Sequence, residues 1–221
     1  MTSSIAHDLP ALAMSAVPYA WCAAADFLAP GWARELEATF PDERFTLNER
    51  RTGSDKTYRI VMNTIVPPGG VLQQALPAPW QRLCDQLLAA PYREAMARLT
   101  GVDLSGALIE LTLNRYHPGH WLSPHTDKYP KLVTQLFYFS GAWDERWGGR
   151  LQILGGPAAS DVVDTVAPAT GRTALIVRSE RSWHAVEPMR EHSPAVRRSL
   201  QVIFWASAPL PVAPGRRTEG A

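Results

Sequence analysis

The residues best suited to chemistry in this chain are its histidines and an acidic residue that follows one of them. The chain has six histidines, and only His125 has an acidic residue two positions later, Asp127. In an extended segment, side chains at positions i and i+2 point the same way, so His125 and Asp127 can bind one metal ion together. A second histidine from a distant strand would complete a set of two nitrogens and one carboxylate on one face of the ion. Such a set leaves the opposite positions open, as in non-haem iron(II) oxygenases.

His184 is our candidate for the second histidine, because it stands at the expected start of a strand in Ser-Trp-His-Ala-Val-Glu-Pro. His117 and His120 are rivals, because both occur in Tyr-His-Pro-Gly-His and a loop that carries both could bind zinc. No cysteine or further histidine cluster accompanies them, so the usual pattern of a zinc site is missing. His192 lies beside glutamate, serine and proline, where we expect an exposed loop.

The segment over residues 109–116 has the alternation of a strand. Isoleucine and leucine at positions 109, 111 and 113 alternate with polar residues. Successive side chains of a strand point to opposite faces, so this strand has one apolar and one polar face. We expect the apolar face to pack on helices and the polar face, with Asn114 and Tyr116, to point inward. A polar interior is costly to build for stability alone, so it indicates a charged ligand inside.

The apolar periodicity places helices in the first third of the chain and strands after residue 107. We expect helices over residues 32–40, 80–88 and 92–100, with prolines near two of their starts and Gly101 after the last. We expect strands over residues 109–116, 134–140, 150–154, 162–166, 173–177, 183–187 and 199–205. Helices followed by a series of short strands favour a mainly β fold, a barrel or sandwich with helices on one outer face.

The composition is that of one globular domain. Of the 221 residues, 46% are hydrophobic and 19% are charged, which is enough apolar side chain for a sizeable core. Lys and Arg number 22 against 21 Asp and Glu, and this near-neutral balance gives no support for a nucleic-acid binder. We expect a loose leader over residues 1–17, a single domain over residues 18–206 and a frayed tail over residues 207–221.

The two cysteines, Cys22 and Cys84, belong to no CxxC motif or Cys/His cluster. We expect two free thiols in a reducing cytoplasm, with one disulfide as the alternative. No stretch approaches the roughly 20 apolar residues of a membrane span. The short apolar run over residues 11–17 has no basic region before it, so it does not fit a signal peptide. We therefore expect a cytoplasmic protein with no membrane partner.

Three segments that carry these residues follow one another in a specific order. They are Asn114-Arg-Tyr-His-Pro-Gly-His-Trp-Leu-Ser-Pro-His125-Thr-Asp127, then Thr134-Gln-Leu-Phe-Tyr138-Phe with Trp143 and Trp147-Gly-Gly-Arg-Leu, then His184-Ala-Val-Glu-Pro with Arg197-Arg-Ser199-Leu. In this order, residues 107–205 resemble the iron(II)/2-oxoglutarate-dependent dioxygenases, most closely the prolyl-4-hydroxylase-like branch.

The resemblance implies a double-stranded β-helix, a cupin-like jelly roll, with N-terminal helices packed on the outer face of its major sheet. It implies that His125, Asp127 and His184 bind Fe(II), and that 2-oxoglutarate chelates the iron through its 1-carboxylate and 2-keto oxygen. Reaction with O2 would release succinate and CO2 and lead to hydroxylation of an unactivated C–H bond. Relatives that halogenate have Gly or Ala at the Asp127 position, so we expect hydroxylation, or desaturation or ring closure by the same oxidant.

The resemblance also implies which residues bind the cosubstrate. A buried carboxylate needs a cation, and arginine suits it because its donors are planar and bidentate. We expect Arg197 to bind the distal carboxylate, because it shares strand parity with Ser199, a possible hydroxyl donor, whereas Arg198 would point the other way. Tyr138 is a further candidate for the same carboxylate. Asn114 and Tyr116 either serve the cosubstrate nearer the iron or are polar core residues with local partners.

The sequence does not name the substrate. A small molecule, such as an amino acid, a sugar acid or a natural-product intermediate, is our first hypothesis, because the chain is compact and several tryptophans lie near the motifs. The second hypothesis is hydroxylation of proline or another residue in a protein or peptide, with the loop over residues 128–131 as part of a rim. A nucleic-acid dealkylase is less favoured, because that branch has a second arginine six residues after the first and this chain has Ile203 or Phe204 there. A metal-binding jelly roll without turnover is the non-enzymatic alternative.

Overall fold

The structure is a computed structural model, and it describes residues 4–53 and 55–207. Its helices are α1 (Ile5–Asp8), α2 (Pro30–Ala38), α3 (Ala78–Leu88), α4 (Ala90–Thr100) and the short 3-10 helices η1 (Leu9–Ala11) and η2 (Glu145–Trp147). Its strands are β1 (Trp21–Ala24), β2 (Thr46–Arg50), β3 (Tyr58–Val66), β4 (Leu108–Tyr116), β5 (Trp121–His125), β6 (Lys131–Tyr138), β7 (Leu151–Leu154), β8 (Val162–Val166), β9 (Thr173–Val177), β10 (His184–Val186) and β11 (Arg197–Trp205).

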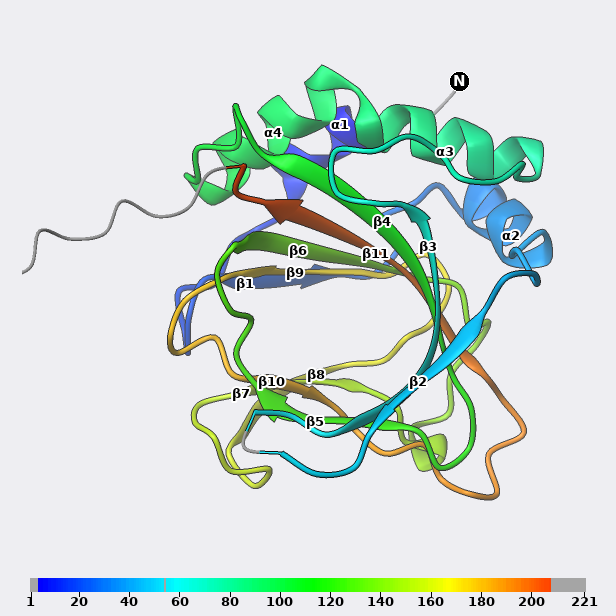
Figure 1. Cartoon of the computed structure of the whole chain (residues 1–221), viewed down its shortest axis with the longest axis vertical. Coiled ribbons are helices and arrows are strands. Elements are labelled where there is room, and N and C mark those ends of the chain that lie inside the picture. The colour runs from blue at the N-terminus through cyan, green and yellow to red at the C-terminus, as the bar shows by residue number, and fades with distance from the viewer. Residues whose placement is uncertain (1–3, 54, 208–221) are drawn as a thin grey trace, which may run out of the picture.

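The strands form one continuous hydrogen-bonded order, β1-β9-β6-β11-β4-β3-β5-β10-β7-β8, and β2 adds to β3. Figure 1 shows that this order folds over on itself, so that β6, β9 and β11 face β5, β7, β8 and β10 across the interior. All the strand pairs within this order are antiparallel. The expected mainly β architecture is therefore confirmed, and its two facing layers enclose the space where the site residues meet.

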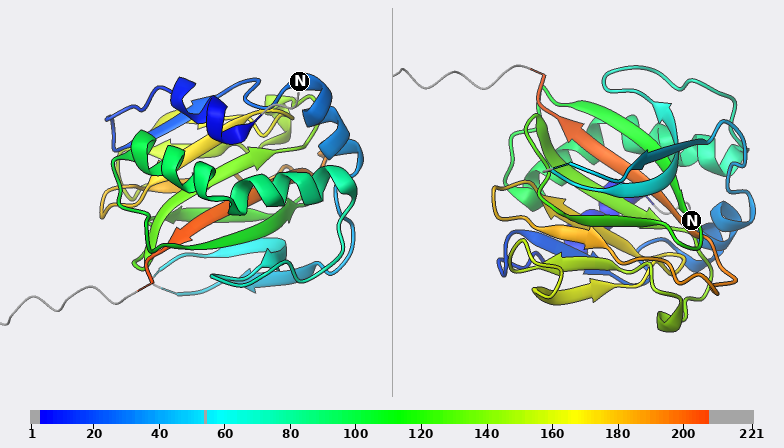
Figure 2. Two further views of the ribbon diagram at one scale, coloured as in Figure 1. Left: turned by 90° about the horizontal axis from the view of Figure 1, so that it is seen from above. Right: turned by 60° about the horizontal axis from the view of Figure 1, so that its bottom comes forward.

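The helices cover the outer face of the larger layer, beside β4 and β11 (Figures 1 and 2). Trp80 of α3 and Tyr92 of α4 are fully buried there, in one cluster with Leu111 and Phe204 of the sheet. Fully burying one large apolar side chain contributes about 1.5–3 kcal/mol. This face of the sheet is thus the main core, and it leaves the opposite face free for polar residues.

Strand β4 shows how one strand serves both faces. Ile109, Leu111 and Leu113 belong to the core under the helices, whereas Asn114 and Tyr116 line the interior between the layers. The alternation predicted from the sequence is confirmed, because the two-residue period of a strand sends neighbouring side chains to opposite faces.

Several strands lie where we did not predict them. The first third of the chain contains β1, β2 and β3, and β5 runs directly into His125. Every residue of β2 is exposed, so it shows no apolar alternation, and β5 contains Pro124, which argues against a strand in a sequence pattern. The β-branched residues of β3 were a usable signal. The prediction of a mostly helical first third was wrong for these segments.

The expected leader over residues 1–17 differs from the structure within its described part. Ile5 and Leu9 are buried with 1% and 0% of their surface exposed, and they join the core beneath α4. These apolar side chains pack on the helices of the main core. The segment is too short for its hydrophobic periodicity to predict this packing. Of the expected tail over residues 207–221, only Ser207 lies within the described residues.

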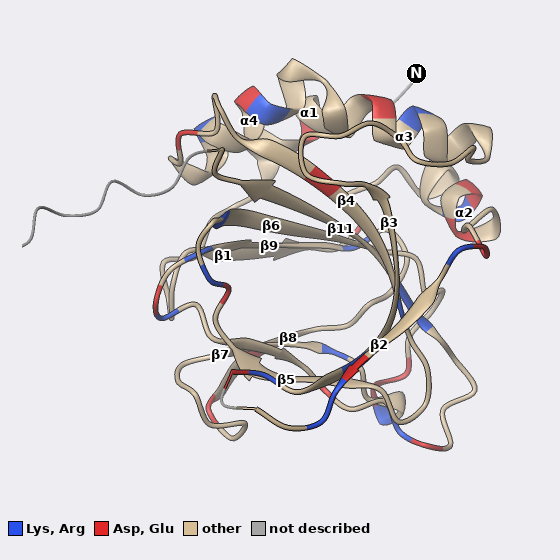
Figure 3. Cartoon of the chain, viewed as in Figure 1, with Lys and Arg blue, Asp and Glu red and all other residues tan. Residues whose placement is uncertain are grey.

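Cys22 and Cys84 are buried free thiols, as predicted. Figure 3 shows Lys and Arg interspersed with Asp and Glu on the helices and loops. None of the helices in the described part of the chain has both the length and the hydrophobicity to cross a membrane.

Candidate active site

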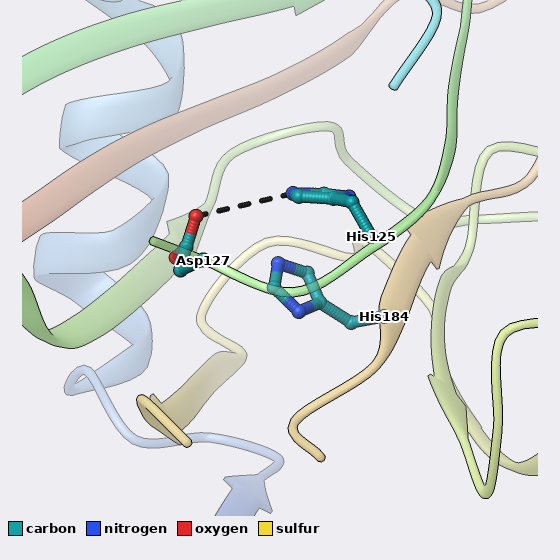
Figure 4. A group of neighbouring side chains, drawn as sticks. All are labelled: His125, Asp127 and His184. Atoms are coloured by element: carbon teal, nitrogen blue, oxygen red, sulfur yellow. Dashed lines mark ion pairs between the residues drawn. The ribbon is translucent and has the colours of Figure 1, made fainter. Parts of the chain in front are cut away.

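His125, Asp127 and His184 come together in the interior between the two layers. His125 ends β5 and His184 begins β10, and these two residues are directly opposite each other in that antiparallel pair. Asp127 follows β5 by two residues. One potential ligand atom from each of the three side chains lies within 4.8 Å of the others, and Figure 4 shows the side chains converging on one point. Two nitrogens and one carboxylate at this spacing can hold a single metal ion.

The hydrogen bonds of both histidines leave one ring nitrogen free toward this point. Nδ1 of His125 lies 3.0 Å from the carbonyl oxygen of Ser123, and Nδ1 of His184 lies 2.9 Å from that of Ser182. A carbonyl oxygen only accepts hydrogen bonds, so we assign the ring proton to Nδ1, which leaves the lone pair of Nε2 available to a metal. Burial lowers the pKa of both histidines. Both are therefore neutral near pH 7, as metal binding requires.

The Asp127 carboxylate is held by two neighbours. Lys131 donates a hydrogen bond of 2.8 Å to its Oδ1, and the Thr134 hydroxyl donates one of 3.2 Å to its Oδ2. Burial by itself raises the pKa of the Asp127 carboxyl, but Lys131 and His184 together outweigh that effect and the net pKa is below its usual range. The carboxylate is thus ionised and oriented toward the histidines.

A cavity of about 240 Å³ runs from these three residues to Arg197 on β11. Arg197 is 1% exposed. Its Nε donates to the carbonyl oxygen of Gly149 at 2.9 Å, and its Nη1 donates to the Ser199 hydroxyl at 3.3 Å. The guanidinium carbon lies 4.8 Å from the ring centroid of Tyr116 and 5.1 Å from that of Tyr138. Arg197 is therefore a buried cation held between two aromatic rings.

The residues around Arg197 are set by the strand register. Arg197 is opposite Tyr116, and Ser199 is opposite Asn114 on one side and Tyr138 on the other. Within the described residues, the Nη2 of Arg197, the hydroxyl of Tyr138 and the Oδ1 of Asn114 are buried without a hydrogen-bond partner. A buried cation without a carboxylate is costly. The Nη2 of Arg197 and the hydroxyl of Tyr138 can donate hydrogen bonds to an anionic ligand that enters the cavity, whereas the Oδ1 of Asn114 can only accept one.

Arg198 and the rival histidines lie elsewhere. The guanidinium carbon of Arg198 is 5.7 Å from the ring centroid of Phe40, and Arg198 does not line the cavity. The rings of His117 and His120 stack edge to face with centroids 5.4 Å apart, outside the group of metal-ligating residues. His192 is exposed on a loop, as expected.

Gly148 and Gly149 form a backbone bend beside Arg197. Their φ angles are 71° and 73°, a region that L side chains rarely adopt. A Cβ on Gly148 would collide with the carbonyl oxygen of Pro188, and a Cβ on Gly149 would collide with the sulfur of Met189. The bend also aims the Gly149 carbonyl at Arg197, which the sequence did not indicate.

Three further residues of the cavity wall carry polar groups that our sequence analysis did not assign to the site. Lys56, Lys131 and Thr134 line the cavity beside the metal-ligating group. Lys131 was noted only as part of a possible rim, and Lys56 precedes a strand that we did not predict. No residue pattern in the sequence distinguishes these lysines from surface lysines, because their placement depends on how distant segments pack.

The segment that carries this site is similar to a known family of proteins. Residues 111–205 match the model of the 2OG-Fe(II) oxygenase superfamily, a segment that contains all three candidate metal ligands and Arg197. A comparison with curated protein sequences found no match.

The fold is similar to those of several solved structures. A prolyl-4-hydroxylase from Pseudomonas putida is 24% identical, with a TM-score of 0.58 over 91% of this chain and 97% of that one. A prolyl hydroxylase from Trichoplax adhaerens, solved with a hypoxia inducible factor oxygen degradation domain peptide fragment, is 18% identical, with a TM-score of 0.60 over 84% and 83%. An oxidoreductase of the 2OG-Fe(II) oxygenase family from Burkholderia pseudomallei is 17% identical, with a TM-score of 0.54 over 93% and 92%. The predicted double-stranded β-helix is confirmed by these likenesses.

Proposed function

We propose that this chain is an oxygenase of the 2OG-Fe(II) superfamily, whose model matches residues 111–205 and whose members use Fe(II), 2-oxoglutarate and O2, and that it hydroxylates an unactivated C–H bond of a small molecule. In this proposal His125, Asp127 and His184 are the iron ligands. When bound, the iron and 2-oxoglutarate supply the oxidising chemistry, with release of succinate and CO2. The protein supplies the ligand set, the open positions and a cavity that limits water.

One observation carries the cosubstrate assignment. Arg197 is a fully buried cation with an unpartnered Nη2, and no described carboxylate forms an ion pair with it. The distal carboxylate of 2-oxoglutarate would pair with this guanidinium, with Ser199 and Tyr138 as hydroxyl donors. Asn114 and Tyr116 lie next to Arg197 along the register and complete the proposed cosubstrate pocket.

Neighbouring hydrogen bonds orient the side chains of the proposed iron ligands. The backbone carbonyls that accept from the Nδ1 atoms of His125 and His184 fix both ring orientations, and Thr134 fixes the carboxylate of Asp127. Such supporting contacts keep a metal site in its productive geometry. The cavity of about 240 Å³ is small beside typical ligand pockets of roughly 300–1,000 Å³, so it suits the cosubstrate together with a compact reacting group.

A peptide or protein substrate is the second candidate function. It is favoured by the similarity to prolyl hydroxylases, one of which was solved with a peptide fragment. A proline side chain is itself a compact group and could enter the same cavity. The difference between the two candidates therefore lies in what surrounds the reacting carbon, not in the chemistry at the metal.

Two measurements test the proposed function. The protein is prepared without oxygen and mixed with Fe(II) and 2-oxoglutarate, and we expect a visible charge-transfer band. Pools of metabolites and pools of proline-containing peptides are then screened in air for succinate release above the background without substrate. Release with a metabolite pool supports the small-molecule proposal, and release with peptides alone replaces it by the second candidate. Absence of the band would overturn both.

A further inference from the structure

We propose that the substrate carries an anionic group, a carboxylate or a phosphate, and that Lys56 binds this group beside Lys131 in the cavity of the metal site. This inference rests on the proposed function and adds a class of substrate to it. It starts from the charge of Lys56, a cavity residue that neither the iron ligands nor the proposed cosubstrate pocket uses.

Lys56 differs from its lysine neighbours in having no ion pair. Lys128 pairs with Asp55 at 3.0 Å, and Lys131 pairs with Asp127 at 2.8 Å. Lys56 is half-buried, yet no carboxylate of the described residues lies within 4.0 Å of its ammonium. Lys56 lines the cavity of the metal site. A half-buried ammonium with an empty side toward a cavity is a ready partner for an anion.

Lys56 and Lys131 lie together beside the metal-ligating group. Both line the main cavity, and both also line a second hollow of about 210 Å³ that shares Asp127 with it. Burial lowers the pKa of Lys56 and repulsion from Lys131 lowers it further, whereas attraction to Asp127 and Asp55 raises it. Because both lysines line the same cavity, one anion there could pair with both ammonium groups.

The charge of the cavity wall supports an anionic substrate even when the cofactors are counted. Among the described residues that line the cavity, Lys56, Lys131 and Arg197 are cationic and Asp127 alone is acidic, which leaves two positive charges in excess. A bound Fe(II) ion adds two more, and the 2-oxoglutarate dianion removes two. Two positive charges therefore remain in a small, partly dry space, where an unpaired charge is expensive. An anionic group on the substrate would reduce this excess, and Lys56 is the cation without a partner.

The test measures anion binding rather than turnover. Protein loaded with Mn(II) and saturated with 2-oxoglutarate is titrated with acetate and, separately, with inorganic phosphate. Paramagnetic broadening of the acetate proton and phosphate phosphorus signals reports binding near the metal. The variants are Lys56→Met, which removes the charge, Lys56→Arg, which keeps it, and Lys128→Met, which removes an exposed lysine of the same region.

We expect at least one of the two anions to bind the wild-type protein. Its Kd is expected to rise roughly tenfold or more in Lys56→Met, because a hydrogen-bonded charge partner is lost. Lys56→Arg and Lys128→Met are expected to stay close to wild type. The anion that responds identifies the group as carboxylate or phosphate. Equal affinity in wild type and Lys56→Met, which would indicate direct binding to the metal only, overturns the inference, as does no binding to the wild-type protein.

A second measurement separates this inference from the proposed function. Lys56 contacts none of the proposed iron or cosubstrate ligands through a hydrogen bond in the described structure, so Lys56→Met should give the same anaerobic Fe(II)/2-oxoglutarate band as wild type. A normal band in both proteins with unchanged anion binding refutes the anionic substrate alone. No band in the wild-type protein refutes the proposed function and this inference with it.

Discussion

His125 and His184 are directly opposite each other across the antiparallel pair of β5 and β10, with their ring centroids 4.3 Å apart. Two strands that are remote in the sequence thus place their imidazole rings side by side, because the two histidines are paired in the strand register. Asp127 then needs only to follow His125 by two residues to complete the group. The proposed metal site therefore depends on strand register, and changes in the residues paired at this register should affect metal binding directly.

Replacement of His184 by alanine should abolish tight metal binding. The variant removes one of three ligands, and we expect the Kd for Fe(II) or Mn(II) to rise by roughly a hundredfold or more, since loss of a merely supporting contact already costs 10–100-fold. Anaerobic calorimetric titration measures the change. His117→Ala is the matched control, because His117 is a partly buried histidine outside the group of metal-ligating residues. A larger loss in the control than in His184→Ala would move the metal site to the rival pair.

The Thr134 hydroxyl should contribute to metal affinity without being a ligand. Thr134→Val keeps the shape of the side chain and removes the donor to Oδ2 of Asp127, so we expect a loss of metal affinity of about tenfold. Thr165→Val, on β8 and away from the cavity, serves as control. Metal titration of the two variants gives the comparison, and equal affinities would show that Lys131 alone suffices to orient the carboxylate.

Arg197 should bind 2-oxoglutarate, and it should lower the free energy of unfolding of the protein when 2-oxoglutarate is not bound. In Arg197→Met, the distal carboxylate would be buried without a cation, and we expect the Kd for 2-oxoglutarate to rise roughly a hundredfold or more. The same variant removes an unpaired buried charge, so the free energy of unfolding without 2-oxoglutarate should rise. Titration of 2-oxoglutarate and urea denaturation measure the two effects. Arg198→Met should retain wild-type cosubstrate affinity, and the reverse order of the two variants would reassign the anchor to Arg198.

His120 should make the fold less stable in mild acid. Burial, with a further contribution from His117, lowers the pKa of His120 from 6.5 to about 4. Between these values the unfolded chain binds more protons than the folded chain, so the free energy of unfolding falls as the pH drops from about 6.5 to about 4. His120→Gln should show a smaller loss between pH 7 and pH 5 in urea denaturation. His192→Gln replaces an exposed histidine and should keep the wild-type slope, and an unchanged slope in His120→Gln would contradict the assignment.

The sequence by itself determined the local geometry of this protein. A two-residue period placed Asn114 and Tyr116 on one face of a strand, put His125 and Asp127 on a common side, and separated Arg197 from Arg198. In the structure Arg198 lies outside the cavity. The residues that line it include Asn114, Tyr116, His125, Asp127 and Arg197. These features were predictable because the direction of a side chain along a strand depends only on its position in that strand.

Only the tertiary structure decided which remote groups meet. It set His184 rather than His117 or His120 opposite His125, and it turned Lys56 and Lys131 toward the cavity. It also revealed that Arg197 is buried with an unpartnered nitrogen. The packing of the whole domain sets the register between distant strands and the burial of a lysine. Neither can be predicted from a single segment of the sequence. For this reason the candidate metal ligands were open to prediction from local patterns, whereas the charges that we propose select the substrate were not.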